Sequence, residues 1–240
     1  MQKNDIEGLL LVNKPRGLTS FDVIQIIREA IKIKKIGHTG TLDPEAEGLL
    51  LLLIGRNATK NASLFMKQDK KYLCSVIFGY KTTSGDRDGL IIDVKEKSIE
   101  EENLLNAIEK FKGKISQKPP MFSAVHHNGK RLYQLAREGI SVDIKSRDVF
   151  IYELKIISFI KNGLLKAELE ISCSSGTYIR TLIEDIAEEI GTFAFISKLV
   201  RVSSGNFTLN NSVKLINLKE NEIKYKIIDT KEALDEIKNS

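Results

Sequence analysis

The chain has 240 residues, and its 42% hydrophobic and 29% charged content indicates a globular protein of one large domain or two small ones. No apolar run approaches the ~20 residues that a membrane helix needs, and the opening residues MQKNDIEG lack the apolar core of a secretory signal, so we expect a cytoplasmic protein that does not enter a membrane. Lysine and arginine outnumber aspartate and glutamate by 37 to 32, a balance that suits a polyanionic partner without requiring one.

The cysteines and histidines form neither a disulfide framework nor a metal-binding pattern. Cys74 and Cys173 stand singly in apolar stretches, where a buried reduced thiol is the simplest interpretation. His38, His126 and His127 have no cysteine nearby and belong to no H-E-x-x-H motif, so we expect no metal site.

The N-terminal part of the chain predicts a strand followed by an amphipathic helix. Residues 8–12 are apolar and precede the turn NKPRG, which is typical of a buried strand. Thr19 and Ser20 can cap a helix whose apolar residues recur at helical spacing as far as Ile31. Gly37 is the residue expected to close this helix.

The rest of the chain mixes strand and helix patterns without strict alternation. The patterns first predict a strand buried on both faces over 49–54, a helix over about 58–67, a strand over 72–80 and a turn-rich connection over 82–89. They then predict a helix over 98–111 and a hairpin of 146–159 with 164–172. A helix over 177–190, which Gly191 stops, and a strand within 193–202 follow. This order predicts an α+β fold with a central mixed, mostly antiparallel sheet flanked by helices.

The loop GHTGTLDPEAEG, residues 37–48, is the strongest candidate for chemistry. Its glycines permit tight turns, and Pro44 biases Asp43 toward an extended conformation directly before a buried strand. The pattern therefore predicts that one carboxylate, that of Asp43, extends from a rigid loop that leads into a buried strand. Taken alone, an Asp-Pro in such a loop is more often a turn or cap residue, and a phosphate-binding loop fits poorly because G-x-x-x-x-G-K-[ST] is absent.

Seven segments together carry a family resemblance. In chain order, within residues 8–207, they are GLLLVNKPRGLTSFDV, GHTGTLDPEAEGLLLLLIGRNATK, KKYLCSVIFG, TTSGDRDG, QKPPMFSAVHHNGKRLYQLAREG, SCSSGTYIRTLIEDI and LVRVSSGNF. In these segments the chain resembles the TruB family of tRNA pseudouridine-55 synthases. The resemblance implies a pseudouridine synthase catalytic domain over 1–210 with an RNA-clamping insertion at about 117–139. The C-terminal extension, 211–240, is too short for the complete PUA domain that many bacterial members carry.

The resemblance implies that the protein isomerises uridine 55 in the T-arm loop of tRNA after flipping the nucleotide, with no metal, redox cofactor or ATP. Asp43 matches the family's essential aspartate, which either attacks C1′ or assists elimination to a glycal. Arg180 of GTYIR matches the arginine that pairs with this aspartate. Tyr72 matches an aromatic residue that stacks on the target base. We expect a monomer whose partner is the T-arm stem-loop, with no obligatory protein partner.

Further positions match family residues that contact the substrate. Tyr178 matches a residue packed near the base, and Leu199 matches one at the pocket wall, although this chain reads Leu-Val-Arg where many members read Leu-Arg-Arg. His38 matches the histidine that fills the space left by flipped bases.

Four basic residues match positions that could meet the RNA backbone. Lys14 and Lys60 match positions near the pocket entrance, where a phosphate contact and a plain solvated lysine are both reasonable. Lys130 and Arg131 lie in the insertion, where basic residues alternate with aromatic rings.

Three other classes of protein remain as alternatives. A non-catalytic tRNA-folding factor could use the same RNA-binding surface, and Asp43→Asn would leave its activity intact. A subunit of a guide-RNA-dependent synthase typically carries the PUA domain that this length cannot supply. A hydrolase with an aspartate nucleophile lacks support, because no His-based triad or metal ligand set is present.

Overall fold

The computed structural model describes residues 6–123, 125–127, 129–216 and 220–238. The chain forms two compact units, which we call the first unit (Met1–Tyr72 with Val200–Ser240) and the second unit (Leu73–Leu199). Within the described ranges, no helix is long and apolar enough to cross a bilayer.

The sheet of the first unit is built on two apolar strands. Strand β1 (Gly8–Lys14) pairs antiparallel with β3 (Glu47–Ile54), and β2 (Ile36–His38) pairs with the other edge of β3 near its end. The C-terminal part of β12 (Ala194–Ser204) pairs parallel with β3 through Val200 and Arg201, and β13 (Phe207–Thr208) pairs antiparallel with β12. Strand β1 also pairs with β14 (Val213–Lys214), which is parallel to it, and with β15 (Ile228–Asp229), which is antiparallel.

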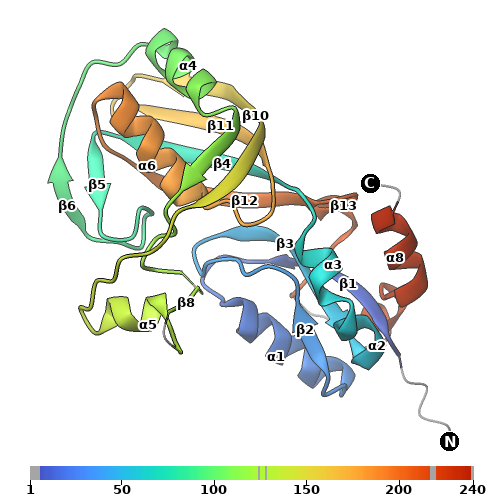
Figure 1. The fold of residues 1–240 in the computed structure, drawn as a ribbon. Helices are drawn as coiled ribbons and strands as arrows, with labels where there is room; N and C mark the ends of the chain where they lie inside the picture. Colours follow the sequence, from blue (N-terminus) through green and yellow to red (C-terminus); the bar gives the residue numbers. More distant parts are fainter. Residues whose placement is uncertain (1–5, 124, 128, 217–219, 239–240) are drawn as a thin grey trace, which may run out of the picture. The chain divides into compact units, whose positions relative to one another are not determined.

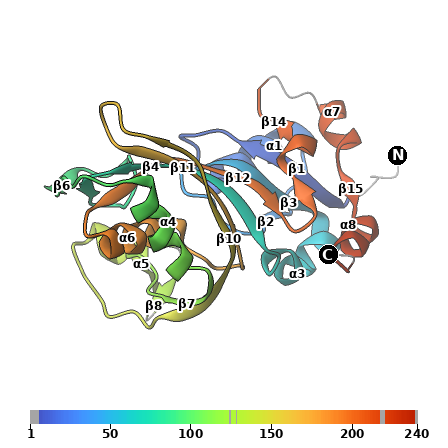
Figure 2. The same cartoon turned by 90° about the horizontal axis from the view of Figure 1, so that it is seen from above.

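Helices cover both faces of β1 and β3, because both strands are apolar at nearly every position (Figures 1 and 2). These elements are α1 (Ser20–Ile31), α2 (Gly55–Lys60), α3 (Ala62–Met66), the 3₁₀ turn η1 (Leu209–Asn211), α7 (Glu220–Tyr225) and α8 (Thr230–Lys238). Leu9, Leu51 and Leu53 pack with Phe65 of α3 and Ala233 of α8 in one buried cluster. The alternate residues of the same strands face the side of α1.

Helix α1 begins as expected and ends differently. The Thr19 hydroxyl accepts from the backbone N–H of Asp22, and the Asp22 carboxylate accepts from the N–H of Thr19, which makes a capping box. The helix ends at Ile31, and Lys32 takes the left-handed capping conformation with φ 58°. Gly37 as the closing residue was therefore wrong, because Gly37 lies in β2.

The sheet of the second unit follows the strand order β12, β4, β11, β10, β7, with β4 (Lys70–Phe78) and β12 each running through the division between the units. The predicted hairpin is confirmed as β10 (Arg147–Ile160) with β11 (Lys166–Cys173), and β7 (Gly113–Gln117) pairs antiparallel with β10. Helices α4 (Glu101–Lys110) and α6 (Ile179–Ile190) lie on one face of these strands (Figures 1 and 2). Gly191 closes α6 at φ 85°, as the sequence predicted.

Two small hairpins belong to the second unit. One joins β5 (Tyr80–Thr82) to β6 (Ile91–Val94), and β6 was not foreseen. The other lies in the predicted insertion and consists of β8 (His126–His127) and β9 (Lys130–Arg131), followed by the short helix α5 (Leu132–Arg137). Residues 124 and 128 of the insertion lie outside the described residues.

The predicted fold class is confirmed: a large mixed, mostly antiparallel sheet flanked by helices. The predicted helix over 58–67 is in fact two short helices, α2 and α3, joined at Asn61.

Candidate active site

Asp43 begins a tight turn. The N–H of Ala46 donates to the carbonyl of Asp43 at 3.1 Å, with Pro44 at the second position, where its fixed φ favours such a turn. Asp43 itself is half-buried. The turn enters β3, whose residues from Gly48 onward are buried, so the carboxylate stands at the start of a rigid strand.

The Lys14 side chain binds this turn through its ammonium group. Its side chain is 0% exposed, and its ammonium donates to the carbonyls of Leu18 at 2.7 Å, Pro15 at 3.0 Å and Pro44 at 3.1 Å. Three donors meet three acceptors, which is the full capacity of an ammonium group. Lys14 thereby fastens the turn after β1 to the turn that Asp43 begins.

Ser20 holds the residue before Asp43. The Ser20 hydroxyl donates to the Leu42 carbonyl at 3.2 Å and accepts from the Leu42 N–H at 3.0 Å. Because Ser20 opens α1, the helix and the loop are joined at this point.

Arg201 of β12 holds the two ends of the loop. Its guanidinium is buried and donates from Nε to the Leu49 carbonyl at 2.7 Å and from Nη2 to the Gly40 carbonyl at 3.1 Å. Gly48 lies so close to Arg201 that an added Cβ would stand 2.4 Å from the Arg201 carbonyl oxygen, and its φ is 101°. Only glycine suits that position.

Lys14 interacts electrostatically with three carboxylates of the loop and of the start of β3. Burial lowers the pKa of Lys14 to about 8, while the carboxylates of Asp43, Glu47 and Glu45 act in the opposite direction. The attraction is mutual, so the charged form of Lys14 favours the ionised form of Asp43. A carboxylate must be ionised to act as a nucleophile.

In the second unit, the segment GTYIR starts α6. Tyr178 is the N-cap residue and is half-buried, and the Arg147 guanidinium lies 4.6 Å above the centre of its ring. The buried amide of Gln117 bonds to both backbone groups of Tyr178. The segment is therefore fixed on both its backbone and its ring.

Arg180 is buried and reaches into two loops of the same unit. Nη1 donates to the Ser84 carbonyl at 2.9 Å, Nη2 donates to the Phe122 carbonyl at 2.8 Å, and Nε lies 3.9 Å from a carboxylate oxygen of Asp86. Since Asp43 and Arg180 belong to different units, their pairing stays a prediction.

Three further predicted residues are found as follows. Tyr72 is buried in β4, Leu199 is half-buried in β12, and His38 is half-buried at the end of β2, next to the loop of Asp43. Their contact with a substrate stays a prediction.

The four predicted phosphate contacts divide by exposure. Lys60, Lys130 and Arg131 are exposed, with Lys130 in an ion pair with Glu138 at 3.1 Å. For Lys14, the expected phosphate contact and the solvated-lysine alternative were both wrong, because its buried ammonium is occupied by three carbonyl oxygens.

Sequence reasoning missed the supporting roles of Ser20, Arg201 and Gln117. Arg201 and Gln117 lie in segments that carried the family resemblance, but a polar residue within a strand pattern does not reveal that it is buried. Ser20 was noted only as a possible helix cap.

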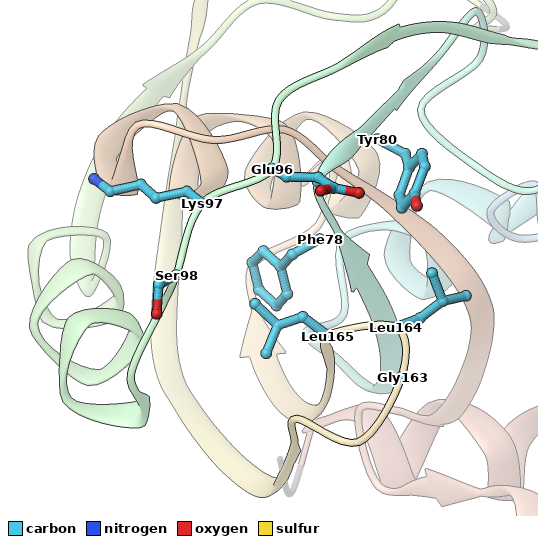
Figure 3. Close-up of a pocket in the computed structure, with 9 residues that line it drawn as sticks. Phe78, Tyr80, Glu96, Lys97, Ser98, Gly163, Leu164 and Leu165 are labelled. Atoms are coloured by element: carbon cyan, nitrogen blue, oxygen red, sulfur yellow. The ribbon is translucent and has the colours of Figure 1, made fainter.

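A hollow in the second unit contains none of the predicted site residues. It has a volume of about 410 Å³ and is lined by residues of β4, β5 and the β10–β11 turn together with Glu96, Lys97 and Ser98. Figure 3 shows Phe78 and Leu165 side by side within it, whereas the Lys97 side chain points away. The Lys97 ammonium donates to the Ile190 carbonyl at 2.6 Å.

Comparison with known proteins identifies relatives over most of the chain. The family model of the TruB pseudouridylate synthase N-terminal domain matches residues 28–179, and that of the tRNA pseudouridylate synthase B C-terminal domain matches residues 180–237. The tRNA pseudouridine synthase B of Clostridium tetani is 41% identical over 230 residues, covering 95% of this chain and 78% of the relative. That of Clostridium acetobutylicum is 42% identical, covering 96% and 78%. Among solved structures, a chain of a Cbf5-Nop10-Gar1 complex shares the fold, with a TM-score of 0.73 and 22% identity over 95% of this chain and 62% of that chain.

Proposed function

The chain belongs to the TruB family of pseudouridylate synthases and is an isomerase that acts on tRNA; we propose that it converts uridine to pseudouridine at position 55, in the loop of the T-arm. The observation that carries this proposal is the loop of Asp43, whose backbone is held by the buried side chains of Lys14, Ser20 and Arg201. Because the backbone of this turn is held in place, the Asp43 carboxylate is preorganised to meet one atom of a bound substrate.

The reaction exchanges one bond for another within the nucleotide. The N1–C1′ bond breaks, the uracil rotates, and C5 joins C1′; the proton on C5 leaves and N1 takes up a proton. Asp43 acts on the sugar, either by attack at C1′ or by assisting elimination to a glycal. Because C1′ of a stacked nucleotide is out of reach, the target is first flipped out of the RNA.

The other site residues receive roles that suit their chemistry. Arg180 pairs with Asp43 and keeps the carboxylate charged as the site closes on the nucleotide. Tyr72 stacks on the target base, Tyr178 packs beside it, and Leu199 forms an apolar wall.

The remaining contacts hold the RNA. His38 occupies the space that flipped bases leave, and the exposed basic residues Lys60, Lys130 and Arg131 meet phosphates of the T-arm. We further propose that the protein works as a monomer in the cytoplasm, without a protein partner.

The test is tritium release from an unmodified T-arm stem-loop whose uracils carry tritium at C5. Formation of the C5–C1′ bond expels that hydrogen into water. Wild type should release it without any added cofactor, and Asp43→Asn should not. Asp235→Asn, which removes a half-exposed carboxylate of α8 in the same unit, is the matched control and should keep the wild-type rate.

Two other outcomes are informative. Release from full tRNA but not from the stem-loop would keep the isomerase and show that recognition extends beyond the T-arm. No release from either RNA, with tight binding of tRNA, would contradict the proposal and favour the tRNA-folding factor.

A further inference from the structure

Two neighbouring strands hold the segment that leads into α6. Gln117, the last residue of β7, and Arg147, the first residue of β10, are paired in register. Gln117 Nε2 donates to the Tyr178 carbonyl at 3.2 Å, and the Tyr178 N–H donates to Gln117 Oε1 at 3.0 Å. Arg147 donates to the Gly176 carbonyl and stacks over the ring of Tyr178. The ends of β7 and β10 thus bind residues 176–178 through hydrogen bonds to the backbone and through the ring contact to Tyr178.

Gln117 is 0% exposed, so both ends of its amide must find partners inside the protein. Both partners belong to Tyr178, and this fixes the position and the orientation of that backbone together. Tyr178 has no side-chain cap at the start of α6, and the Gln117 amide binds its backbone at that point. Arg180 follows two residues later in the first helical turn, so a displacement of Tyr178 displaces Arg180 as well.

The same strand end leads into the RNA-clamping insertion. Gln117 is the first residue of that insertion, and Phe122, five residues on, accepts a 2.8 Å hydrogen bond from Arg180. The base of the insertion is therefore bonded at two points to the segment that carries Tyr178 and Arg180.

We propose that Gln117 is a positioning residue: it aligns Tyr178 and Arg180 for the isomerisation. This inference rests on the proposed function. Both polar ends of the Gln117 side chain bond to the Tyr178 backbone, so Gln117 acts through that residue. Its loss should therefore slow the chemical step on bound RNA and leave the affinity for RNA nearly unchanged.

The test compares Gln117→Met, which keeps the length of the side chain and loses both hydrogen bonds, with wild type and with Ser116→Ala, an exposed neighbour on β7. Tritium release is measured at saturating and limiting tRNA, well below the midpoint of thermal unfolding. We expect kcat to fall roughly ten- to hundredfold, the size of effect that a misplaced active-site group produces, while KM changes less than about twofold. Ser116→Ala should match wild type.

Gln117→Glu gives a second readout that does not depend on Gln117→Met folding. A protonated glutamic acid can both donate to the Tyr178 carbonyl and accept from its N–H, whereas the ionised form places negative charge against that carbonyl. The ratio of its kcat to that of wild type should rise as the pH falls from about 8 to about 5.5.

The outcomes separate the two proposals. An unchanged kcat in Gln117→Met, a rise in KM alone, or a pH-independent ratio for Gln117→Glu would overturn the role of Gln117 while wild-type activity stands. Absence of tritium release by wild type would instead overturn the proposed function.

Discussion

Arg201→Met removes the guanidinium that joins the two ends of the Asp43 loop and keeps a side chain that still fills apolar space. The substitution deprives the Leu49 and Gly40 carbonyls of their bonds at 2.7 Å and 3.1 Å, in a place where the arginine is only 2% exposed. Water does not readily replace the lost donor there.

The magnitude follows from these two bonds. The buried Leu49 carbonyl and the partly buried Gly40 carbonyl, left without their donor, each cost up to about 1–3 kcal/mol. Relief from burying a charge offsets part of the sum, so we expect a net loss of about 2–4 kcal/mol. For a chain of this length, about 3 kcal/mol lowers the unfolding midpoint by about 6–12 °C.

The assay is thermal unfolding followed by circular dichroism, with tritium release measured at 25 °C, far below the midpoint. Because Gly40 lies three residues before Asp43, kcat should also fall, by about tenfold or more. Arg201→Lys keeps one donor group and should lie between Met and wild type. Lys198→Met, an exposed change on the same strand, is the control for stability. An unfolding midpoint for Arg201→Met equal to that of Lys198→Met would refute the reasoning.

Two further predictions concern the same loop. Gly48→Ala places a Cβ 2.4 Å from the Arg201 carbonyl oxygen at a φ of 101°, so it should lower the unfolding midpoint, and an unchanged midpoint would show that the strand relaxes at no cost. Folding lowers the pKa of Lys14 from 10.5 to about 8, so between these pH values the unfolded chain holds a proton that the folded chain has released. The contribution of Lys14 to stability therefore increases as the pH rises from 8 toward 10.5, by at most about 3 kcal/mol. Urea unfolding of wild type and Lys14→Met at pH 7 and pH 10 should reveal this increase in wild type alone, and an equal pH dependence in both would contradict it.

The elements that could be predicted from the sequence are those specified by residues within the element itself. The apolar run of β3 has one plausible environment, a strand buried on both faces, and Gly191 at the end of an amphipathic helix is a strong stop signal. The end of α1 was missed because Lys32, a residue that rarely takes the left-handed conformation, caps it in place of a glycine.

The buried polar residues could not be predicted, because their partners come together only in the folded chain. Lys14 is the last residue of β1 and precedes a proline, a position that is usually solvated, yet three carbonyls of two turns converge on its ammonium. Gln117 bonds to a residue 61 positions away, and Arg201 to one 161 positions away. Asp43, by contrast, can be identified from the sequence alone, because its loop and its family motif coincide.

The proposed role of Asp43 in position-specific isomerisation is tested most directly by mapping the product. An unmodified tRNA transcript is incubated with wild type or Asp43→Asn, treated with a carbodiimide that remains on pseudouridine, and reverse transcribed. Wild type should give one new stop, caused by pseudouridine at position 55, and Asp43→Asn should give none. A stop caused by another position, or the same stop with Asp43→Asn, would contradict the assignment.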